Sequence, residues 1–349
     1  MIHVMVLCLL SAAADAGLPD AGVTSDAGYD ARAPSTWRLD AKFKDGGIRE
    51  ALIADFTHKA VGTSETALTR EEAEALLDDP RAAMIYGDKT VSIVAPSMVT
   101  RHRQEHVDLM KRFLLPERVE AGRKFMVEKD AVLSATEKKT GVDRQVIIGI
   151  LMWESKLGTI TGDFFAFNAL ASQAFFIDEA NAVALSREEE KAMLSGVSAD
   201  PKKKAKKPTE EEVAKIAAAR AEAERKQANR VESIRNRGRK NLMALVRQCK
   251  TRGIDPLSVK GSWAGALGFP QFMPASLRWA DDGNGDGKID LFDMDDAIAS
   301  VGRYLASAGF KKSARDAVYD YNHEAAYVEG VLAFAAALKA PPDGGVATP

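Results

Sequence analysis

The 349-residue sequence predicts a mainly α-helical fold. Helical spacing recurs along the chain, and alternating β-branched runs are few, with MIYGDKTVSIV at 84–94 as the best candidate for a small β element. Apolar residues lie three and four positions apart over 104–115, 120–139, 142–157, 240–250, 295–308 and 324–339. The hydrophobic fraction of 46% is ordinary for a soluble protein and excludes wholesale disorder.

Charge and cysteine content exclude several classes of protein. The 48 Lys+Arg and 50 Asp+Glu residues leave a formal net charge of -2, so no overall basicity indicates nucleic-acid binding. The two cysteines, Cys8 and Cys249, do not supply a disulfide framework or a cysteine-built zinc site. Any metal must therefore be held by oxygen ligands.

The N-terminal segment predicts export. Residues 1–14 run apolar from Val4 to Leu10 and then turn to small residues, which is the order of a secretory signal peptide. A frayed apolar terminus is the alternative, because no basic residue stands at the start. The run is shorter than the about 20 residues that span a membrane, so we expect an exported, periplasmic protein without a membrane span. Cys8 lies inside the apolar run, which disfavours a lipid anchor.

Composition divides the rest of the chain. Residues 15–45 repeat Asp, Ala, Gly and Pro and predict a solvated linker, 46–340 form the folded domain, and 341–349 form a flexible tail. Within the domain, a segment at about 186–235 is rich in Ala, Glu, Lys and Arg, and predicts a helical insertion exposed on most sides. A solvated insertion is favoured over a clamp for an anionic polymer.

Glu154 is the candidate general acid. The predicted helix at 142–157 carries Ile147 and Ile150 toward one side, and Glu154 follows them by seven and four residues, on the same apolar face. Burial raises the pKa of a carboxyl, which then holds the proton that a general acid delivers. Gly158 and Gly162 are expected to end the helix. The alternative is a glutamate that reaches solvent or pairs with an arginine.

A turn-rich segment downstream predicts a carbohydrate-binding wall. VKGSWAGALGFPQFMPAS at 259–276 presents Ser262, Trp263, Gln271 and Phe272 between glycines and prolines. Aromatic faces stack on sugar rings, and hydroxyl and amide groups bond their substituents. A plain glycine-rich loop between helices explains the composition equally well when it is taken alone.

Four ordered motifs then resemble one family. They are WES with a following glycine, GALGFPQFMPAS, an Asp/Gly loop and DYNHEAAYVEGVL. In this order the sequence resembles the membrane-bound lytic murein transglycosylase B family over roughly residues 45–340, apart from the charged insertion. The resemblance implies a lysozyme-like catalytic core with an additional helical lobe, peptidoglycan glycan strands as the partner, and no organic cofactor.

The resemblance also implies a reaction. The β-1,4 bond between N-acetylmuramic acid and N-acetylglucosamine is cleaved while the muramic 6-hydroxyl closes a 1,6-anhydro ring, with Glu154 as acid and then base. It assigns substrate binding to Ser262, Gln271, Tyr304, Tyr321 and Asn322. The last two alternatively pack and cap the entrance of the final helix. A hydrolytic muramidase and a non-catalytic, calcium-dependent wall-binding protein remain as alternatives.

One departure from the family concerns charge. Adjacent arginines often follow its first substrate-lining helix, whereas FFIDEANAV at 175–183 has none. Arg235 and Arg237, beyond the insertion, align there only loosely. Recognition of a peptide or muramic carboxylate is therefore left open.

The loop DGNGDGKIDLFD at 282–293 has the spacing of an EF-hand. Its side-chain oxygens stand at the first, third, fifth and twelfth positions, with a glycine at the sixth and a carbonyl at the seventh. The predicted ligands are Asp282, Asn284, Asp286, Lys288 and Asp293. We expect a structural Ca²⁺, with a metal-free Asp-Gly turn as the alternative, because aspartate at the twelfth position reaches less far than glutamate.

Overall fold

The structure is a computed structural model that describes residues 37–39, 46–58, 66–196 and 209–341. The predicted signal peptide, most of the predicted linker and residues 342–349 lie outside these ranges. In the described part the chain is mainly helical, as the sequence predicts, and none of its helices combines the length and hydrophobicity needed to cross a membrane.

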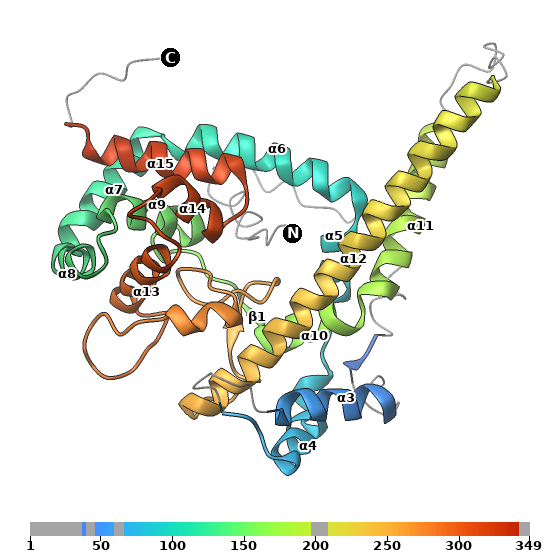
Figure 1. Ribbon diagram of the computed structural model, residues 1–349, viewed down its shortest axis with the longest axis horizontal. Helices are drawn as coiled ribbons and strands as arrows, with labels where there is room; N and C mark the ends of the chain where they lie inside the picture. Colours follow the sequence, from blue (N-terminus) through green and yellow to red (C-terminus); the bar gives the residue numbers. More distant parts are fainter. Residues whose placement is uncertain (1–36, 40–45, 59–65, 197–208, 342–349) are drawn as a thin grey trace, which may run out of the picture.

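The helices follow one another through mostly short connections (Figure 1). They are α3 (Gly46–Thr57), α4 (Arg70–Asp78), α5 (Gly87–Val94), α6 (Pro96–Phe113), α7 (Pro116–Glu128), α8 (Asp130–Thr140), α9 (Arg144–Ser155), α10 (Ala166–Phe175), α11 (Ile177–Gly196), α12 (Glu210–Arg252), α13 (Met294–Ser307), α14 (Ala314–Tyr321) and α15 (Ala325–Lys339), with 3₁₀ helices η2 (Pro80–Ala83) and η3 (Pro274–Trp279). A small antiparallel sheet pairs β1 (Phe164–Phe165) with β2 (Lys260–Gly261).

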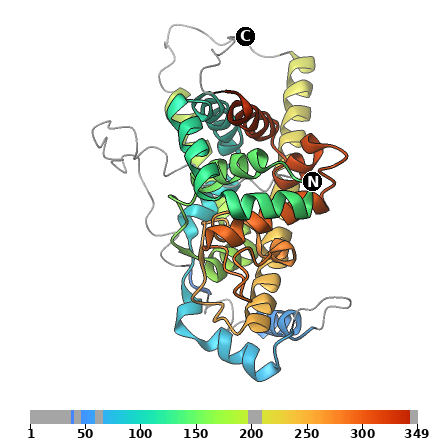
Figure 2. The same ribbon diagram turned by 90° about the vertical axis from the view of Figure 1, so that its left-hand side faces the viewer.

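Two large hydrophobic clusters form most of the core. One joins α3, α4, α10 and the C-terminal half of α12, and the other joins α7, α9, α13 and α15. Figures 1 and 2 show α3 and α4 at the opposite end of the molecule from α15. Tyr304 and Tyr321 pack against both clusters, so the two bodies of core meet at this aromatic pair.

Residues 87–94 of the segment 84–94 are helical, and its prediction as a strand is wrong. Helix α5 begins at Gly87, and the Thr90 amide and hydroxyl both donate to the Tyr86 carbonyl, at 2.9 and 2.8 Å. Val91 and Val94 are buried in a third cluster with residues of α11. Tertiary packing therefore overrides the β preference of this β-branched run.

The predicted helix at 120–139 is two helices. Lys129 has φ −106° and ψ 19° and separates α7 from α8. The Lys129 ammonium lies 2.7 Å from the Asp295 carboxylate at the start of α13. The break lets α8 pack along α13, which positions the loop preceding that helix.

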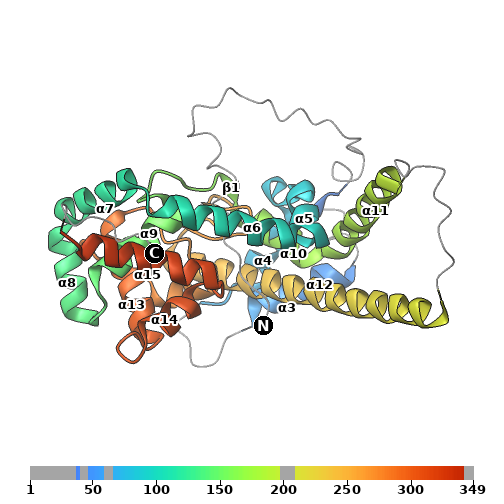
Figure 3. The ribbon, with the colours of Figure 1, turned by 90° about the horizontal axis from the view of Figure 1, so that it is seen from above.

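The charged segment forms much of α11 and the first half of α12. Both helices project from the rest of the molecule (Figures 1 and 3). Most residues from Glu210 to Ala228 are exposed, as expected for a solvated helix.

Packed residues precede the expected domain boundary at residue 46. Leu39 is fully buried, and Trp37 stacks on Phe176 with ring centroids 6.1 Å apart.

Candidate active site

Glu154 lies in the last turn of α9, where every residue from Val146 to Ser155 is buried. It has no exposed surface (0%), and neither carboxyl oxygen has a hydrogen-bond partner in the described part of the chain. Burial raises the pKa of Glu154 to about 8, and the nearby Tyr327 hydroxyl offsets part of the rise. A carboxyl with this pKa is protonated about ten to one at pH 7. The predicted burial of Glu154 is confirmed. The side chain neither faces solvent nor pairs with an arginine of the described residues.

The end of α9 differs from the expectation. The helix stops at Ser155, and Lys156 and Leu157 take left-handed conformations with φ of 47° and 55° before Gly158 is reached. The Gly158 amide donates to the Ser155 hydroxyl at 3.0 Å, which fixes the reversal. Two non-glycine residues in this region are strained, a feature that often accompanies functional sites.

Two tyrosines lie near the Glu154 carboxyl. Burial, followed by the charge of Glu154, raises the pKa of both Tyr321 and Tyr327 well above the ordinary value. Their rings stack nearly parallel, with centroids 6.4 Å apart. The Tyr321 hydroxyl donates to the Pro270 carbonyl at 2.5 Å, whereas the Tyr327 hydroxyl has no partner of normal geometry among the described residues. Tyr327 is therefore the donor available to a Glu154 carboxylate.

The sequence pattern does not single out Tyr327. It lies inside the motif DYNHEAAYVEGVL, six residues after Tyr321. Nothing in its local spacing distinguishes it from a core aromatic. The signal that could have found it is its membership of a motif in which Tyr321 and Asn322 were already assigned.

The turn-rich wall holds Ser262 and Gln271 in different ways. The Ser262 hydroxyl accepts from the Ala266 amide at 3.1 Å and so closes the 262–266 turn. Gln271 lies in a turn closed by the paired backbones of Leu267 and Phe272, with φ of 51°. Its amide nitrogen donates to the Gly268 carbonyl at 2.7 Å, while its carbonyl oxygen has no partner in the described residues. The Gln271 side chain is thus fixed in place, with a buried acceptor left unpaired among the described residues.

Asn322 carries a buried side-chain amide. It is 1% exposed, and neither polar atom of its side chain makes a hydrogen bond within the described ranges. It follows the last residue of α14, and Glu324 occupies the N-cap position of α15. The capping interpretation of Asn322 is therefore wrong. A buried unsatisfied amide costs about 1–3 kcal/mol, which is a reason to expect a ligand there.

A cavity of about 400 Å³ brings part of the predicted set together. Gln271, Tyr304 and Tyr321 line it, but Glu154, Ser262 and Asn322 do not. Glu154 is connected to the cavity through Tyr321, whose ring forms part of the lining and whose pKa responds to the Glu154 charge. The volume lies within the range of small-molecule sites, about 300–1,000 Å³.

Of the two loosely aligned arginines, Arg237 belongs to this cavity. Its guanidinium donates to the Gln173 carbonyl oxygen at 3.2 Å, and burial together with the charge of Arg230 lowers its pKa to about 10. Arg235 instead pairs with Asp178 at 2.6 Å and with Glu232. A cation therefore does lie in the sugar-sized cavity, although the adjacent pair expected from the family is absent at 175–183.

The predicted calcium loop folds around its own amides. Asp282 accepts from the amides of Gly285 and Gly287 at 2.6 and 2.8 Å, and Asn284 accepts from Asp286 at 2.9 Å. Asp293, at the twelfth position, caps α13 by accepting from the Asp295 amide at 2.8 Å. Within the described residues, no three His, Cys, Asp or Glu side chains gather closely enough to hold a metal ion.

Asp296 closes this loop and was missed from the sequence. It is 1% exposed and accepts from the amides of Gly283 and Asp290, at 2.8 and 2.7 Å. It lies three residues beyond the twelve-residue register, so the spacing did not select it. The signal that could have found it is the run of acidic residues at the start of α13.

Comparison with known proteins agrees with this architecture. The E. coli (strain K12) membrane-bound lytic murein transglycosylase B is 29% identical over 209 residues, which is 60% of this chain and 43% of that protein. The chain thus matches less than half the length of this relative.

Three solved structures share the fold at low identity. The E. coli lytic transglycosylase SLT35 in complex with bulgecin A superposes with a TM-score of 0.56 and 18% identity, over 85% of this chain and 94% of that one. A calcium complex of SLT35 gives 0.55 and 19%, with the same coverage. SltB3 from Pseudomonas aeruginosa, in complex with NAG-NAM-pentapeptide, gives 0.52 and 16%, over 87% and 80% of the two chains.

The family model for the transglycosylase SLT domain matches residues 63–319, which is most of the chain and includes Glu154 and the turn-rich wall, whereas Tyr321, Asn322 and Tyr327 lie beyond its end. The chain belongs to the transglycosylase SLT domain family.

Proposed function

We propose that this protein is a peptidoglycan lytic transglycosylase that uses Glu154 as its single acid and base. The observation that carries the proposal is the Glu154 carboxyl itself: it is buried, free of hydrogen bonds among the described residues and protonated at neutral pH. It lies beside a tyrosine that lines a sugar-sized cavity. The relatives act on, or were solved with, murein components, which gives the substrate class.

The proposed reaction needs no second protein carboxylate. Glu154 donates its proton to the glycosidic oxygen as the bond from C1 of N-acetylmuramic acid breaks. The Glu154 carboxylate then takes the proton of the muramic 6-hydroxyl, whose oxygen forms a new bond to C1 and closes the 1,6-anhydro ring. The proton returns to Glu154, so the enzyme is unchanged. Because the nucleophile is tethered to the reacting carbon, the step gains a large effective molarity.

The causes of the Glu154 pKa shift agree with a reaction that uses one carboxylate. A hydrolytic muramidase places a second carboxylate about 5–9.5 Å from the first. In the described part of the chain, the pKa of Glu154 is set by burial and by Tyr327, with no contribution from a neighbouring acid. After the first proton transfer, the Tyr327 hydroxyl would donate to the Glu154 carboxylate. This hydrogen bond stabilises the carboxylate and lowers the pKa of Glu154.

Product analysis tests the proposal. Purified sacculi digested with the wild type should yield 1,6-anhydro products, each one water lighter than the hydrolytic product, in mass spectra. Glu154→Gln keeps the side-chain volume and removes the titratable proton, so it should abolish release while the protein still binds sacculi. Hydrolytic products indicate a muramidase instead, and unchanged turbidity loss by Glu154→Gln indicates that Glu154 is incidental.

Export follows from the substrate, because peptidoglycan lies outside the cytoplasm. The pattern of residues 1–14 supports export, although these residues lie outside the described part. Cell fractionation with mass measurement of the mature chain tests it. Recovery of the uncut chain in the cytoplasm would contradict it.

We also propose that the 282–293 loop binds a structural Ca²⁺. Its support is the oxygen-rich donor set, the closely turned loop and the calcium complex of SLT35. Asp282, Asn284, Asp286 and the Lys288 carbonyl fit the donor chemistry, whereas Asp293 is engaged as a helix cap. Asp296, which already closes the loop, competes with Asp293 for the last position.

A further inference from the structure

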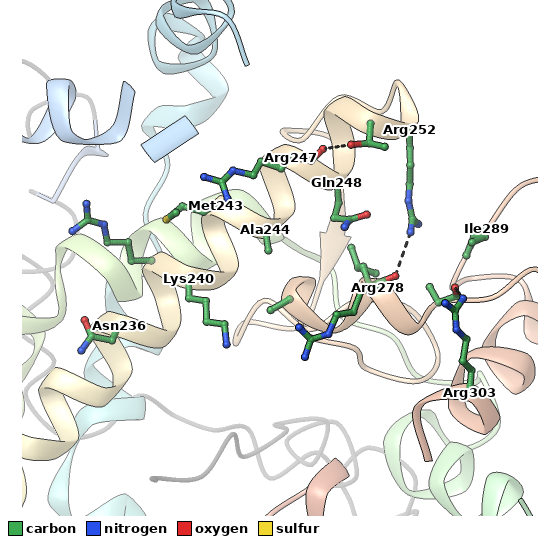
Figure 4. Close-up of a pocket in the computed structure, with 15 residues that line it drawn as sticks. Asn236, Lys240, Met243, Ala244, Arg247, Gln248, Arg252, Arg278, Ile289 and Arg303 are labelled. Atoms are coloured by element: carbon green, nitrogen blue, oxygen red, sulfur yellow. Dashed lines mark hydrogen bonds between the residues drawn. The ribbon is translucent and has the colours of Figure 1, made fainter. Parts of the chain in front are cut away.

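A second cavity of about 870 Å³ lies between the C-terminal half of α12 and η3 (Figure 4). Its charged lining is wholly basic, since no Asp or Glu belongs to it. The cationic residues are Arg239, Lys240, Arg247, Arg252, Arg278 and Arg303. Because the whole chain has a formal net charge of -2, this concentration of positive charge is local. We call this cavity the cationic groove.

Three of these cations already have structural partners. Arg239 pairs with the Asp55 carboxylate at 2.6 Å, and Arg247 donates to the Asp55 carbonyl at 2.8 Å. Arg252 donates to the Leu277 carbonyl at 3.5 Å and so connects α12 to η3. These contacts stabilise the walls of the groove.

The other three cations have little or no carboxylate pairing within the described residues. Arg278 is exposed and stacks on the Trp279 ring, 3.8 Å from the ring centroid. Arg303 donates to the Ala280 carbonyl at 3.1 Å and is 3.9 Å from the Asp281 carboxylate. Lys240 is exposed, and Figure 4 shows its side chain and that of Arg278 extending into the space between α12 and η3. Charge is thus available to an anionic ligand.

The cationic groove adjoins the smaller cavity that Gln271 and Tyr321 line. Asn236, Lys240 and Ala275 line both. The Arg278 charge also acts on Tyr304, which lines the smaller cavity, because it opposes the burial that raises the Tyr304 pKa to about 12. A ligand whose sugar occupies the smaller cavity can therefore extend a substituent into the cationic groove.

We propose that the cationic groove binds carboxylates of the stem peptide that a muramic acid residue carries. The inference rests on the proposed function, because that function puts the glycan in the adjoining cavity. A stem peptide is attached to the sugar and ends in a free carboxylate, so it is an anionic substituent at short range. Exposed arginines with planar guanidinium groups bind carboxylates in a bidentate manner.

A binding experiment in the Glu154→Gln background tests this without turnover. Calorimetry compares the disaccharide NAG-NAM-pentapeptide with the same disaccharide without peptide. The peptide-bearing ligand should bind more tightly. Arg278→Gln and Arg303→Gln should each weaken it by about threefold to tenfold and leave the peptide-free ligand nearly unaffected. Raising the salt concentration should reduce the difference between the two ligands.

The matched control is Arg220→Gln, which removes one charge from an exposed part of the same helix, where Arg220 pairs with Glu224 at 2.9 Å. It should leave both affinities unchanged. Equal affinities for the two ligands, or equal losses from Arg220→Gln and Arg278→Gln, overturn the proposal. Inorganic polyphosphate is a further probe. If it binds more tightly than the pentapeptide ligand and its binding depends on Arg278, the proposal is overturned in favour of a phosphate-polymer site.

The outcomes separate this inference from the proposed function. If sacculi yield no anhydro products but the pentapeptide preference persists, the groove remains a peptide-binding site and the catalytic assignment fails. If anhydro products form while the two ligands bind equally, the reaction stands and the groove assignment fails.

Discussion

The burial of Glu154 makes the folding stability depend on pH in a defined direction. Its pKa rises from 4.5 to about 8 on folding, so the folded protein holds this proton more tightly than the unfolded chain. The contribution to stability is therefore fully present below about pH 4.5 and is lost as the pH rises through about 8. Integrated over this interval, the loss is about 3 kcal/mol at pH 7 and about 5 kcal/mol above pH 8.

Glu154→Gln removes this dependence, because an amide does not titrate. The free energy of unfolding of the variant, minus that of the wild type, should rise by about 3 kcal/mol between pH 4 and pH 7 and level off near pH 9. Other titrating groups cancel in the difference. Urea unfolding followed by circular dichroism, repeated at each pH, measures it.

The same substitution at Glu120, an exposed residue of α7, provides the control and should show no rise of this size. A difference between Glu154→Gln and the wild type that stays constant from pH 4 to pH 9 refutes the reasoning. It would mean that water or a charged partner reaches the carboxyl in solution.

Three further predictions concern activity and metal binding. Tyr327→Phe removes the hydroxyl that lowers the Glu154 pKa, so the alkaline limb of kcat/KM against pH should move to higher pH; an unmoved limb excludes this contact. Asn322→Leu should raise the free energy of unfolding by about 1–2 kcal/mol while sacculus digestion falls, and a loss of stability would show that the amide is satisfied in solution. Chelation of calcium should lower the melting temperature. Asp282→Asn should remove this calcium-dependent change in melting temperature. Asp293→Asn should preserve it, because asparagine also caps helices and Asp293 would then serve only as a cap.

The position of Glu154 could be predicted because it depends only on local periodicity. A helical repeat sets the face of a residue from its neighbours seven and four positions away, whatever the rest of the chain does. Its complete burial, by contrast, arises from α15, which packs closely on α9: a Cβ at Gly149 would lie 3.1 Å from the Val331 carbonyl oxygen. That contact joins segments about 180 residues apart, beyond any local pattern.

The differences between the predictions and the structure also arise from contacts that local sequence patterns do not show. MIYGDKTVSIV has the composition of a strand, but its valines are buried against α11, where helical spacing fits and alternation does not. The twelve-residue register assigns Asp293 to the metal, and in the structure Asp293 is the N-cap of α13, which begins at Met294. Asp296 accepts from the amides of Gly283 and Asp290 but lies outside the twelve-residue register, and Tyr327 acts on Glu154 from a remote part of the sequence, so spacing reveals neither.

The hydrogen bond from Tyr321 to Pro270 has a consequence for turnover. It connects α14 to the turn that holds Gln271, across the junction of the two hydrophobic clusters. Because Glu154 has no exposed surface, we expect that in the proposed reaction a glycosidic oxygen meets the acid only after this hydrogen bond between α14 and the turn has opened. Without substrate, the protonated Glu154 carboxyl is therefore shielded from solvent. We expect substrate entry, not bond cleavage alone, to set the pace of the reaction.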